Sequence, residues 1–254
     1  MTYYNGNALY DYLSAGQLPQ FRFVTGNAWQ LVYGDHNCHP LALIFAAGVP
    51  AQQLDSPPAS QEKADYALLQ TVGDRAGLPV RYIRFACDIA QVETVKVSDH
   101  SFVYETRTMP QLSALFGAWG LPVSGTPTAK YLNDQTSSAY HNWQRSSLGG
   151  NLTVSDIDLW KLDTTGQPRV IFELKRSYYE LERWQPFTDD YRNFTLLSNL
   201  CNQAGLQFKI IYNQRTKAPF ADKIDRLKIF AVNFAVNPPV VEKGIIALNE
   251  LENI

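Results

Sequence analysis

The sequence predicts an α/β fold, and three observations support this prediction. Apolar residues make up 45% and charged residues 18% of the 254 residues, which is typical of a globular chain that forms one large or two small domains. Short apolar runs of strand-like composition alternate with longer, mildly amphipathic stretches that end at glycine. In the second half these segments follow the order helix, strand, strand, helix, strand, which indicates helices packed on a sheet.

The first half contains seven of the expected segments. Its expected helices share an amphipathic pattern, and the second of them ends at Gly77, a glycine of the type that closes helices; they cover residues 7–13, 61–76 and 109–119. Its expected strands share apolar and β-branched residues; they cover residues 29–33, 41–45, 80–85 and, as a β pair, 92–104. Three prolines within residues 50–61 predict a loop.

A stretch rich in glycine and proline, residues 120–127, predicts a linker between the two halves. We therefore expect an N-terminal α/β domain over residues 1–122 and a second domain over residues 123–254. The expected helices of the second domain cover residues 128–148 and 189–204. Its expected strands cover residues 154–162, 169–174, 207–212 and 227–233, and a polar turn joins the first two into a hairpin.

Charge and known motifs narrow the classes of function. The net charge of −2 is not typical of a protein that coats nucleic acid. No apolar run approaches the ~18 residues of a membrane span, and no basic region precedes an apolar stretch at the start. The chain has no Walker A loop, nucleophile elbow or dinucleotide-binding glycine motif. Three widely spaced cysteines indicate a reduced protein, so we expect a cytoplasmic location and no membrane partner.

The expected hairpin carries charged residues inside otherwise apolar strands. Because alternate residues of a strand share a face, Asp156 and Asp158 are expected on one face of the first strand. Glu173 and Lys175 are expected on one face of the second strand. Charged side chains are rarely buried without a partner or a metal. The pattern therefore indicates a site rather than a structural hairpin alone.

Two carboxylates on adjacent strands can bind one hard cation, and Mg²⁺ takes one or two carboxylates together with waters and phosphate oxygens. We expect Asp158 and Glu173 to bind Mg²⁺, for which Mn²⁺ would substitute, with Asp156 as an accessory or alternative ligand. The backbone carbonyl of Leu174 is a further candidate ligand. Lys175 would orient an attacking water or stabilise the charge that develops on a phosphoryl group.

This spacing resembles the PD-(D/E)XK nuclease superfamily, which includes restriction enzymes, junction resolvases and repair nucleases. Asp158 precedes Glu173 by 173 − 158 = 15 residues, and one apolar residue separates Glu173 from Lys175. The resemblance covers about the C-terminal half and implies a restriction-endonuclease-like core of order α-β-β-β-α-β. It also implies that Asp158, Glu173 and Lys175 are catalytic. The helix before the hairpin departs from some members of the superfamily, because residues 128–148 contain no glutamate; Asp134 is one substitute there.

Polar residues on either side of the hairpin are candidate contacts to a substrate phosphate. Gln144 and Arg145 end the preceding helix, and Arg176 and Ser177 follow the second strand. A solvated helix face and packing against the sheet are the alternatives for these residues. The expected function is a magnesium-dependent DNA endonuclease in restriction, phage biology or repair, with DNA favoured over RNA and a homodimer left open. The alternative is a non-catalytic nucleic-acid-binding or protein-interaction module on the same fold.

Two pairs of segments in the two halves resemble each other. Residues 68–85 align with 196–213 at an offset of 128, and residues 43–48 align with 170–175 at an offset of 127. We therefore hypothesise that the N-terminal half is a degenerate copy of the C-terminal core, in which Leu31, Ala46 and Gly48 replace Asp158, Glu173 and Lys175. The alternative explanation for the resemblance is that junctions in which a helix ends at glycine before a strand recur in many α/β proteins.

The segment from Asp35 to His39 contains two histidines, a cysteine and an aspartate, as a zinc site would. It has no second pair of ligands at a suitable spacing, and closed zinc sites usually need four ligands. A polar hairpin turn is the preferred interpretation. The proposed copy agrees, because it aligns this segment with the turn around residues 164–167.

Overall fold

The structure is a computed structural model that describes residues 6–16, 18–24, 27–128 and 138–254. The chain divides into two compact units. We call residues 1–23 together with 157–254 the split unit, and residues 24–156 the inserted unit. Both are mixed α/β units, as the composition and periodicity predict. Among the described helices, none is long and apolar enough to cross a membrane.

The split unit contains a six-stranded sheet of order β1-β8-β9-β10-β11-β12. The strands are β1 (Phe21–Arg22), β8 (Leu159–Leu162), β9 (Pro168–Ser177), β10 (Gln207–Lys217), β11 (Phe220–Val232) and β12 (Val240–Ala247). The pair β9–β10 is parallel and the other pairs are antiparallel. The parallel pair requires a crossover, and helix α5 (Tyr191–Ala204) supplies it after the short 3-10 helix η2 (Thr188–Asp190).

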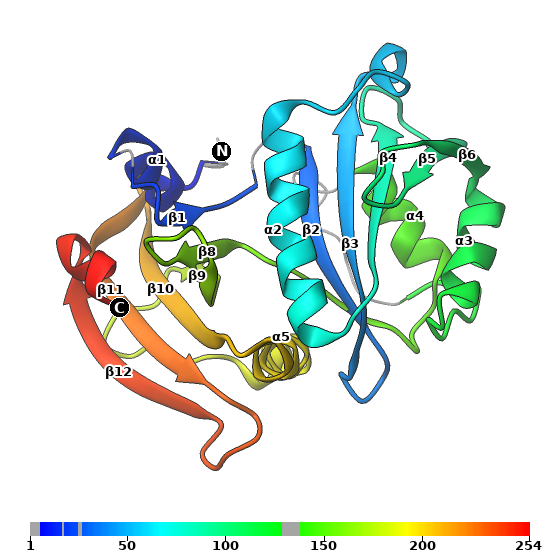
Figure 1. Cartoon of the computed structure of the whole chain (residues 1–254). Helices are drawn as coiled ribbons and strands as arrows, with labels where there is room; N and C mark the ends of the chain where they lie inside the picture. The colour runs from blue at the N-terminus through cyan, green and yellow to red at the C-terminus, as the bar shows by residue number, and fades with distance from the viewer. Residues whose placement is uncertain (1–5, 17, 25–26, 129–137) are drawn as a thin grey trace. The chain divides into compact units, whose positions relative to one another are not determined.

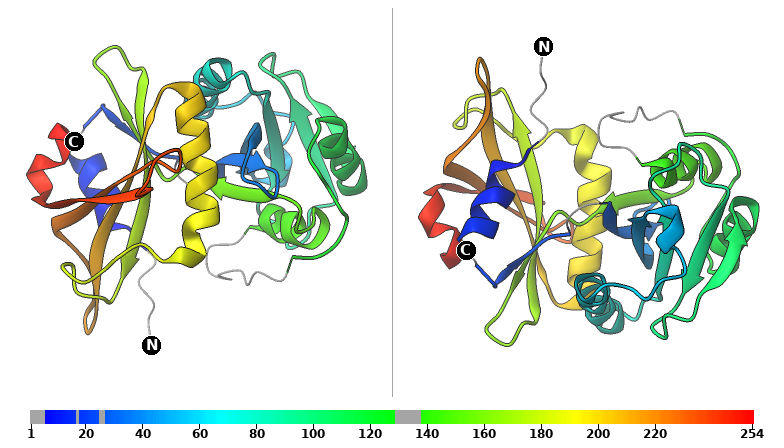
Figure 2. Two further views of the ribbon diagram at one scale, coloured as in Figure 1. Left: turned by 90° about the horizontal axis from the view of Figure 1, so that it is seen from below. Right: turned by 90° about the horizontal axis from the view of Figure 1, so that it is seen from above.

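Helices cover both faces of this sheet (Figures 1 and 2). Helix α1 (Ala8–Ala15) and the 3-10 helix η3 (Leu248–Asn253) pack on one face. That face contributes alternate strand residues to a buried cluster, among them Leu159, Phe172 and Ile211. Helix α5 covers the other face, where Phe194 contacts Phe208. Both faces of the central strands are therefore buried, which explains their nearly continuous apolar runs.

The inserted unit contains a second six-stranded sheet, of order β6-β5-β4-β3-β2-β7. The strands are β2 (Ala28–Gly34), β3 (Pro40–Val49), β4 (Val80–Ala86), β5 (Thr94–Ser98), β6 (Glu105–Thr108) and β7 (Thr153–Asp156). Only the pair β3–β4 is parallel. The 3-10 helix η1 (Ala51–Gln53) and helix α2 (Ser60–Ala76) connect those two strands across one face. Helices α3 (Met109–Ala118) and α4 (Ala139–Ser147) pack on the other face.

The expected strand over residues 154–162 is wrong as a single strand. It breaks at Ile157 and Asp158 into β7 and β8, which belong to different sheets. Strand β7 pairs with β2, while β8 pairs with β9 in the expected hairpin. Asp156 therefore lies in the inserted unit and Asp158 in the split unit, and the two aspartates do not share one strand face.

The expected domain boundary at residues 122 and 123 is also corrected. The glycine- and proline-rich stretch 120–127 lies within the inserted unit, because the chain returns through α4 and β7 to the same sheet. Residues 1–23 join the C-terminal segment, because β1 pairs with β8. The helix expected over 128–148 is observed as α4, which begins at Ala139; residues 129–137, including Asp134, lie outside the described residues.

The two units have the same topology. Both sheets run, from one edge, through a short strand, an antiparallel hairpin, a parallel strand after a helix, and two further antiparallel strands. The whole element series α-β-β-β-3-10-α-β-β-β also repeats in the chain, beginning once at α1 and again at α4. Different strand orders would have contradicted the hypothesis of an internal copy, and the orders agree.

Both hairpins turn in the same way. Asp35 accepts hydrogen bonds at Oδ1 from the amides two and four residues later, and Asp163 does the same. Cys38 (φ 63°) and Gly166 (φ 80°) are the left-handed residues of the two turns, and 166 − 38 = 128. The hairpin turn preferred over a zinc site for residues 35–39 is therefore confirmed.

Strand pairing corrects the residue correspondence between the units. The equivalent antiparallel pairs are Leu31 with Ile44 and Leu159 with Phe172, an offset of 128 for both partners. The expected counterparts Leu31, Ala46 and Gly48 assumed an offset of 127 and are each wrong by one residue. With the offset of 128, the counterparts of Asp158, Glu173 and Lys175 are Gln30, Phe45 and Ala47. The differences are 158 − 128 = 30, 173 − 128 = 45 and 175 − 128 = 47.

The first strand of each repeat pairs with the sheet of the other repeat. Strand β1 precedes β2 in the chain but pairs with β8, and β7 precedes β8 but pairs with β2. The exchange is reciprocal and explains why the split unit is discontinuous. Sequence periodicity carries no signal for such an exchange, because either sheet edge would accept either strand.

Candidate functional site

Three predicted residues meet at the β8–β9 hairpin of the split unit. Glu173 and Lys175 lie on β9, and Asp158 directly precedes β8. Since Leu159 pairs with Phe172 in the antiparallel ladder, the next step along the hairpin brings Asp158 level with Glu173. Register therefore brings the acidic residues of the two strands side by side, as expected.

Glu173 and Lys175 occupy the sheet face that α5 covers. Phe172 and Leu174, which alternate with them, pack into the cluster under α1 on the opposite face. Glu173 is 8% exposed, so its carboxylate is largely removed from water. A buried carboxylate needs compensating partners, and the neighbouring lysine is one of them.

The ammonium group of Lys175 lies between two carboxylates. Its Nζ is 3.0 Å from Glu173 Oε1 and 3.2 Å from Asp190 Oδ2. It also lies 5.3 Å from the ring centroid of Phe194 on α5. Burial lowers the pKa of Lys175, but Glu173 and then Asp190 outweigh this effect and hold the pKa above its usual value. Lys175 is therefore a positive charge at neutral pH rather than a general base.

Asp158 is tied to the neighbouring strand through its side chain. Its Oδ2 accepts a hydrogen bond of 2.7 Å from the backbone amide of Leu174. Its backbone carbonyl accepts a bond of 2.8 Å from the hydroxyl of Tyr10 on α1. These contacts fix the start of β8 against the segment of β9 that carries Glu173 and Lys175.

The donor set suits a hard divalent cation in type and number. Asp158 and Glu173 offer carboxylate oxygens, and Mg²⁺ takes one or two carboxylates while keeping several waters. Within the described residues, no three His, Cys, Asp or Glu side chains form a group that could hold a metal by themselves. A cation here would therefore complete its coordination with water and substrate oxygens rather than with a protein cage.

Asp156, the accessory ligand candidate, lies with α4 in the inserted unit. Burial lowers the pKa of His141, Asp156 raises it, and Arg145 lowers it, with a net decrease. Burial also lowers the pKa of Arg145, and Asp156 opposes that shift. Asp156, His141 and Arg145 therefore form one electrostatic group. His141 Nδ1 is 2.9 Å from Oγ of Ser138, which caps α4.

The other candidates for substrate contact make contacts within their own units. Gln144 accepts a hydrogen bond of 2.6 Å from the buried hydroxyl of Tyr33. Arg176 donates to the carbonyl of Gly6 and lies 2.9 Å from Asp222, an aspartate whose side chain is 1% exposed. The structure therefore does not bring Arg176 to Lys175, because successive strand residues point to opposite faces.

Ser177 follows Lys175 on the same face of β9. Its Oγ is 2.9 Å from the hydroxyl of Tyr212, whose ring stacks on Trp184 at a centroid distance of 4.1 Å. Ser177 thus anchors the loop that leads from β9 towards α5. Trp184, which is buried and stacked on Tyr212, is therefore a packing residue.

Asp190 is a further member of this site, beyond the residues that the sequence predicts. Acidic residues at the start of a helix, such as Asp189 and Asp190 before α5, usually cap the helix and interact with its dipole. The side chain of Asp190 makes no cap hydrogen bond to α5 and instead pairs with Lys175. The available signal was its position: the first turn of the helix after a parallel β strand lies over that strand's carboxyl end.

The inserted unit has an ion pair at the equivalent place. Glu62 of α2 corresponds to Asp190, since 190 − 62 = 128, and its Oε1 is 3.0 Å from Nε of Arg84 on β4. Arg84 is 3% exposed and also donates to the backbone carbonyls of Gln53, Leu54 and Ser56. The positively charged partner thus lies on the third strand in the split unit, as Lys175, and on the fourth strand in the inserted unit, as Arg84. Ala47 occupies the position equivalent to Lys175.

Comparisons with known proteins identify no relative. No family model matches the chain, and no curated protein matches it. A search of solved structures gives the C-terminal domain of the sex pheromone staph-cAM373 precursor from Staphylococcus aureus. That structure has a TM-score of 0.15 and 9% identity, with 85% of this chain and 69% of that chain covered. A score this low carries no inference about fold or function.

Proposed function

We propose that this protein is a metal-dependent nuclease that hydrolyses phosphodiester bonds in DNA, with its site in the split unit. The observation that carries the proposal is the convergence of Asp158, Glu173 and Lys175 at one hairpin. Lys175 Nζ is 3.0 Å from Glu173 Oε1, and Asp158 accepts a hydrogen bond from the backbone amide of Leu174, the residue between Glu173 and Lys175. The site would function in restriction, phage biology or repair.

Topology supports the proposal independently of these side chains. A helix, a short strand, an antiparallel hairpin, a helix and a parallel strand form the core that the resemblance to PD-(D/E)XK nucleases implies. The elements α1, β1, β8, β9, α5 and β10 of the split unit follow this order along the chain, with the inserted unit between β1 and β8, and this order supports the proposal. Asp158 directly precedes the second strand of the order β1-β8-β9-β10, and Glu173 lies on the third.

Each residue has a distinct role in the proposal. Asp158 and Glu173 would hold Mg²⁺ or Mn²⁺, together with the carbonyl of Leu174. A bound divalent cation lowers the pKa of a water ligand and polarises the phosphoryl group. Lys175, held protonated by Glu173 and Asp190, would stabilise negative charge that develops at the scissile phosphate. Asp190 would act as a positioning residue, because it pairs with the ammonium group of Lys175.

A second candidate function is a non-catalytic nucleic-acid-binding or protein-interaction module on the same fold. The specific observation in its favour is the equivalent ion pair of Glu62 and Arg84 in the inserted unit, where Ala47 and Phe45 replace the lysine and glutamate of the site. A buried ion pair beneath the first turn of this helix can therefore be structural in this fold. Binding of DNA without cleavage and without dependence on Mg²⁺ would favour this candidate.

The test is cleavage of supercoiled, linear, branched and single-stranded DNA, and of RNA, with Mg²⁺, Mn²⁺ or a chelator present. We expect cleavage only with a divalent cation. Glu173→Gln and Lys175→Gln should each lower the rate by roughly 10²-fold or more, because each removes a charge from the reacting centre.

Lys223→Gln provides the matched control, because Lys223 is an exposed lysine on β11 of the same unit. It should cleave at the wild-type rate. Wild-type rates for both Glu173→Gln and Lys175→Gln would refute the assignment of the site. Cleavage of no substrate by a folded wild-type protein would leave the second candidate.

A further inference from the structure

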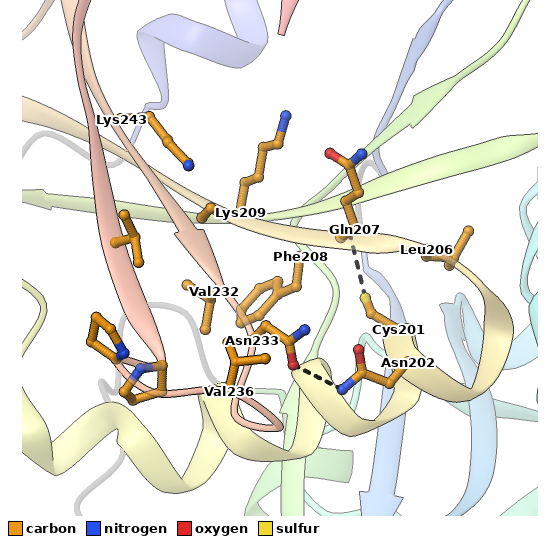
Figure 3. A pocket seen from close by; sticks show the side chains of 14 residues that line it. Cys201, Asn202, Leu206, Gln207, Phe208, Lys209, Val232, Asn233, Val236 and Lys243 are labelled. Carbon is orange, nitrogen blue, oxygen red and sulfur yellow. Dashed lines mark hydrogen bonds between the residues drawn. The ribbon is translucent and has the colours of Figure 1, made fainter.

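A pocket of about 250 Å³ lies in the split unit at the end of its sheet, apart from the hairpin that carries Glu173 (Figure 3). It is formed by the end of α5, the start of β10, the end of β11, the β11–β12 turn and β12. Its walls are largely apolar, and their side chains include Leu206, Phe208, Val232, Val236 and Val241.

Two lysines lie at one end of this pocket. Figure 3 shows Lys209 on β10 and Lys243 on β12 at that end, with β11 between these strands in the sheet, while Asn202 and Asn233 lie at the other end. Asn202 Nδ2 donates a hydrogen bond of 3.1 Å to Asn233 Oδ1, so these two side chains are bonded to each other. None of the 14 lining residues is Asp or Glu, so the lining carries positive charge alone.

Lys209 is half-buried and Lys243 is exposed, and their contacts differ from those of two other lysines of the unit. Lys228, which is 0% exposed, donates to two backbone carbonyls and pairs with Glu242. Lys161 donates to the carbonyls of Glu252 and Ile254. Among the described residues, the ammonium groups of Lys209 and Lys243 make no ion pair or hydrogen bond.

The positive charges repel one another at this end of the pocket. Burial lowers the pKa of Lys209, and Lys161 and Lys243 lower it further. A half-buried ammonium group beside two others is unfavourable unless a counter-charge is present. An anion between Lys209 and Lys243 would remove that penalty and gain charge-assisted hydrogen bonds.

We propose that this pocket binds a small amphiphilic anion, whose acidic head lies between Lys209 and Lys243 and whose apolar body lies against Phe208, Val232 and Val236. The chemistry fits an aliphatic carboxylate or phosphate monoester with a short chain. Pockets for drug-sized ligands usually enclose roughly 300–1,000 Å³, so a volume just below that range fits a ligand of this size. The proposal is independent of nuclease activity.

Calorimetric titration of the whole chain with octanoate, octyl phosphate and octan-1-ol tests the proposal, because the three probes share one apolar chain and differ in the head group. We expect both anions to bind with millimolar or tighter dissociation constants and octan-1-ol to bind at least about tenfold more weakly. The anion that binds more tightly identifies the preferred head group. Amide chemical shifts should change at residues 206–209 and 231–243.

Lys209→Gln and Lys243→Gln should each weaken binding of the anions about tenfold and leave binding of octan-1-ol unchanged. Lys223→Gln, which changes an exposed lysine on the intervening strand β11 outside the pocket lining, should bind like the wild type. Val236→Glu tests the apolar wall of the pocket and leaves the core intact, because Val236 is 56% exposed. It should also weaken the binding of both anions.

Three results would overturn the proposal. One is the absence of binding of either anion at millimolar concentration. Another is equal binding of octanoate and octan-1-ol. The third is wild-type affinity in the Lys209→Gln, Lys243→Gln double variant, whose fold can be verified by its amide spectrum.

Discussion

Glu62 and Asp190 hold equivalent positions at the start of α2 and of α5, the helices that follow the central hairpin of each unit, and each pairs with a positively charged side chain on the sheet. Glu62 Oε1 is 3.0 Å from Nε of Arg84, and Asp190 Oδ2 is 3.2 Å from Nζ of Lys175. The carboxylate keeps its place, since 190 − 62 = 128, while its partner changes strand. The two units can therefore be compared. The pair of Asp190 and Lys175 belongs to the proposed site, whereas the pair of Glu62 and Arg84 lies in the unit where apolar or amide side chains replace Asp158, Glu173 and Lys175.

Two substitutions of Asp158 distinguish its structural role from its proposed role in cation binding. Asp158→Asn keeps an oxygen that can accept the hydrogen bond from the Leu174 amide, whereas Asp158→Ala removes it. We expect Asp158→Asn to keep wild-type stability and lose cleavage, because it lacks the charge that binds a cation. Asp158→Ala should also lose about 1–3 kcal/mol of unfolding free energy, since it leaves a partly buried amide without its acceptor.

Urea unfolding measures the stabilities of both Asp158 variants, and plasmid cleavage with Mg²⁺ measures their activities. Cleavage by Asp158→Asn at the wild-type rate would contradict a role in cation binding. Equal stabilities of the two variants would show that the bond to Leu174 contributes little.

The ion pair of Glu62 and Arg84 should stabilise the inserted unit. Arg84→Met leaves the carboxylate of Glu62 beneath α2 without its cation, and breaking a buried pair in this way costs about 3–5 kcal/mol. The double variant Glu62→Gln, Arg84→Met should recover part of that loss, because no charge remains unpaired.

A double-mutant cycle of urea unfolding free energies tests this coupling. Arg107→Met is the control, since Arg107 is an arginine of the same unit that pairs with Glu105 at a more exposed place. Additive losses from Glu62→Gln and Arg84→Met would contradict the coupling.

Lys228 should hold the loop between β9 and α5 in place. Its buried ammonium group donates 2.9 Å hydrogen bonds to the carbonyls of Glu182 and Trp184, and it lies 3.1 Å from Glu242. Lys228→Met leaves both carbonyls without a donor, so we expect a loss of about 3 kcal/mol in unfolding free energy. Proteolysis should also become faster within residues 178–187.

The control for this change is Lys223→Met, because Lys223 is exposed on the same strand. It should leave both the unfolding free energy and the cleavage pattern unchanged. Unaltered protease resistance of Lys228→Met would contradict the role of Lys228 as an anchor.

His141 should make the stability of the inserted unit depend on pH. Burial lowers its pKa, and the unfolded histidine has a pKa of about 6.5, so the unfolded state binds more protons just below that pH. The unfolding free energy should therefore fall as the pH drops from about 6.5 through the lower pKa of the folded state. Above pH 6.5 both states are neutral and this contribution is fully present.

Urea unfolding across this pH range tests the dependence. His141→Gln should remove it. Asp156→Asn should strengthen it, because Asp156 is the neighbour that raises the pKa of His141, while Arg145 lowers it. A slope that is the same in wild type and His141→Gln would contradict the assignment.

The local structure of the chain was predictable from its sequence because it depends on neighbouring residues. Helix α2 ends at Gly77 and α5 at Gly205, both in the left-handed conformation that only glycine adopts at low cost. The apolar runs that predict β3, β4 and β10 are strands, because both faces of each are covered. The β8–β9 hairpin and the position of Glu173 and Lys175 on one face follow from the period of two.

Only the tertiary structure decides which strand edge accepts which strand. The run 154–162 has the composition of one strand, yet backbone pairing divides it between two sheets at Asp158. Pairing uses the same N–H and C=O groups in every strand, so the local sequence pattern does not reveal that β1 joins β8 and β7 joins β2. The same long-range pairing corrects the offset to 128, brings Asp190 to Lys175, and turns Arg176 towards Asp222.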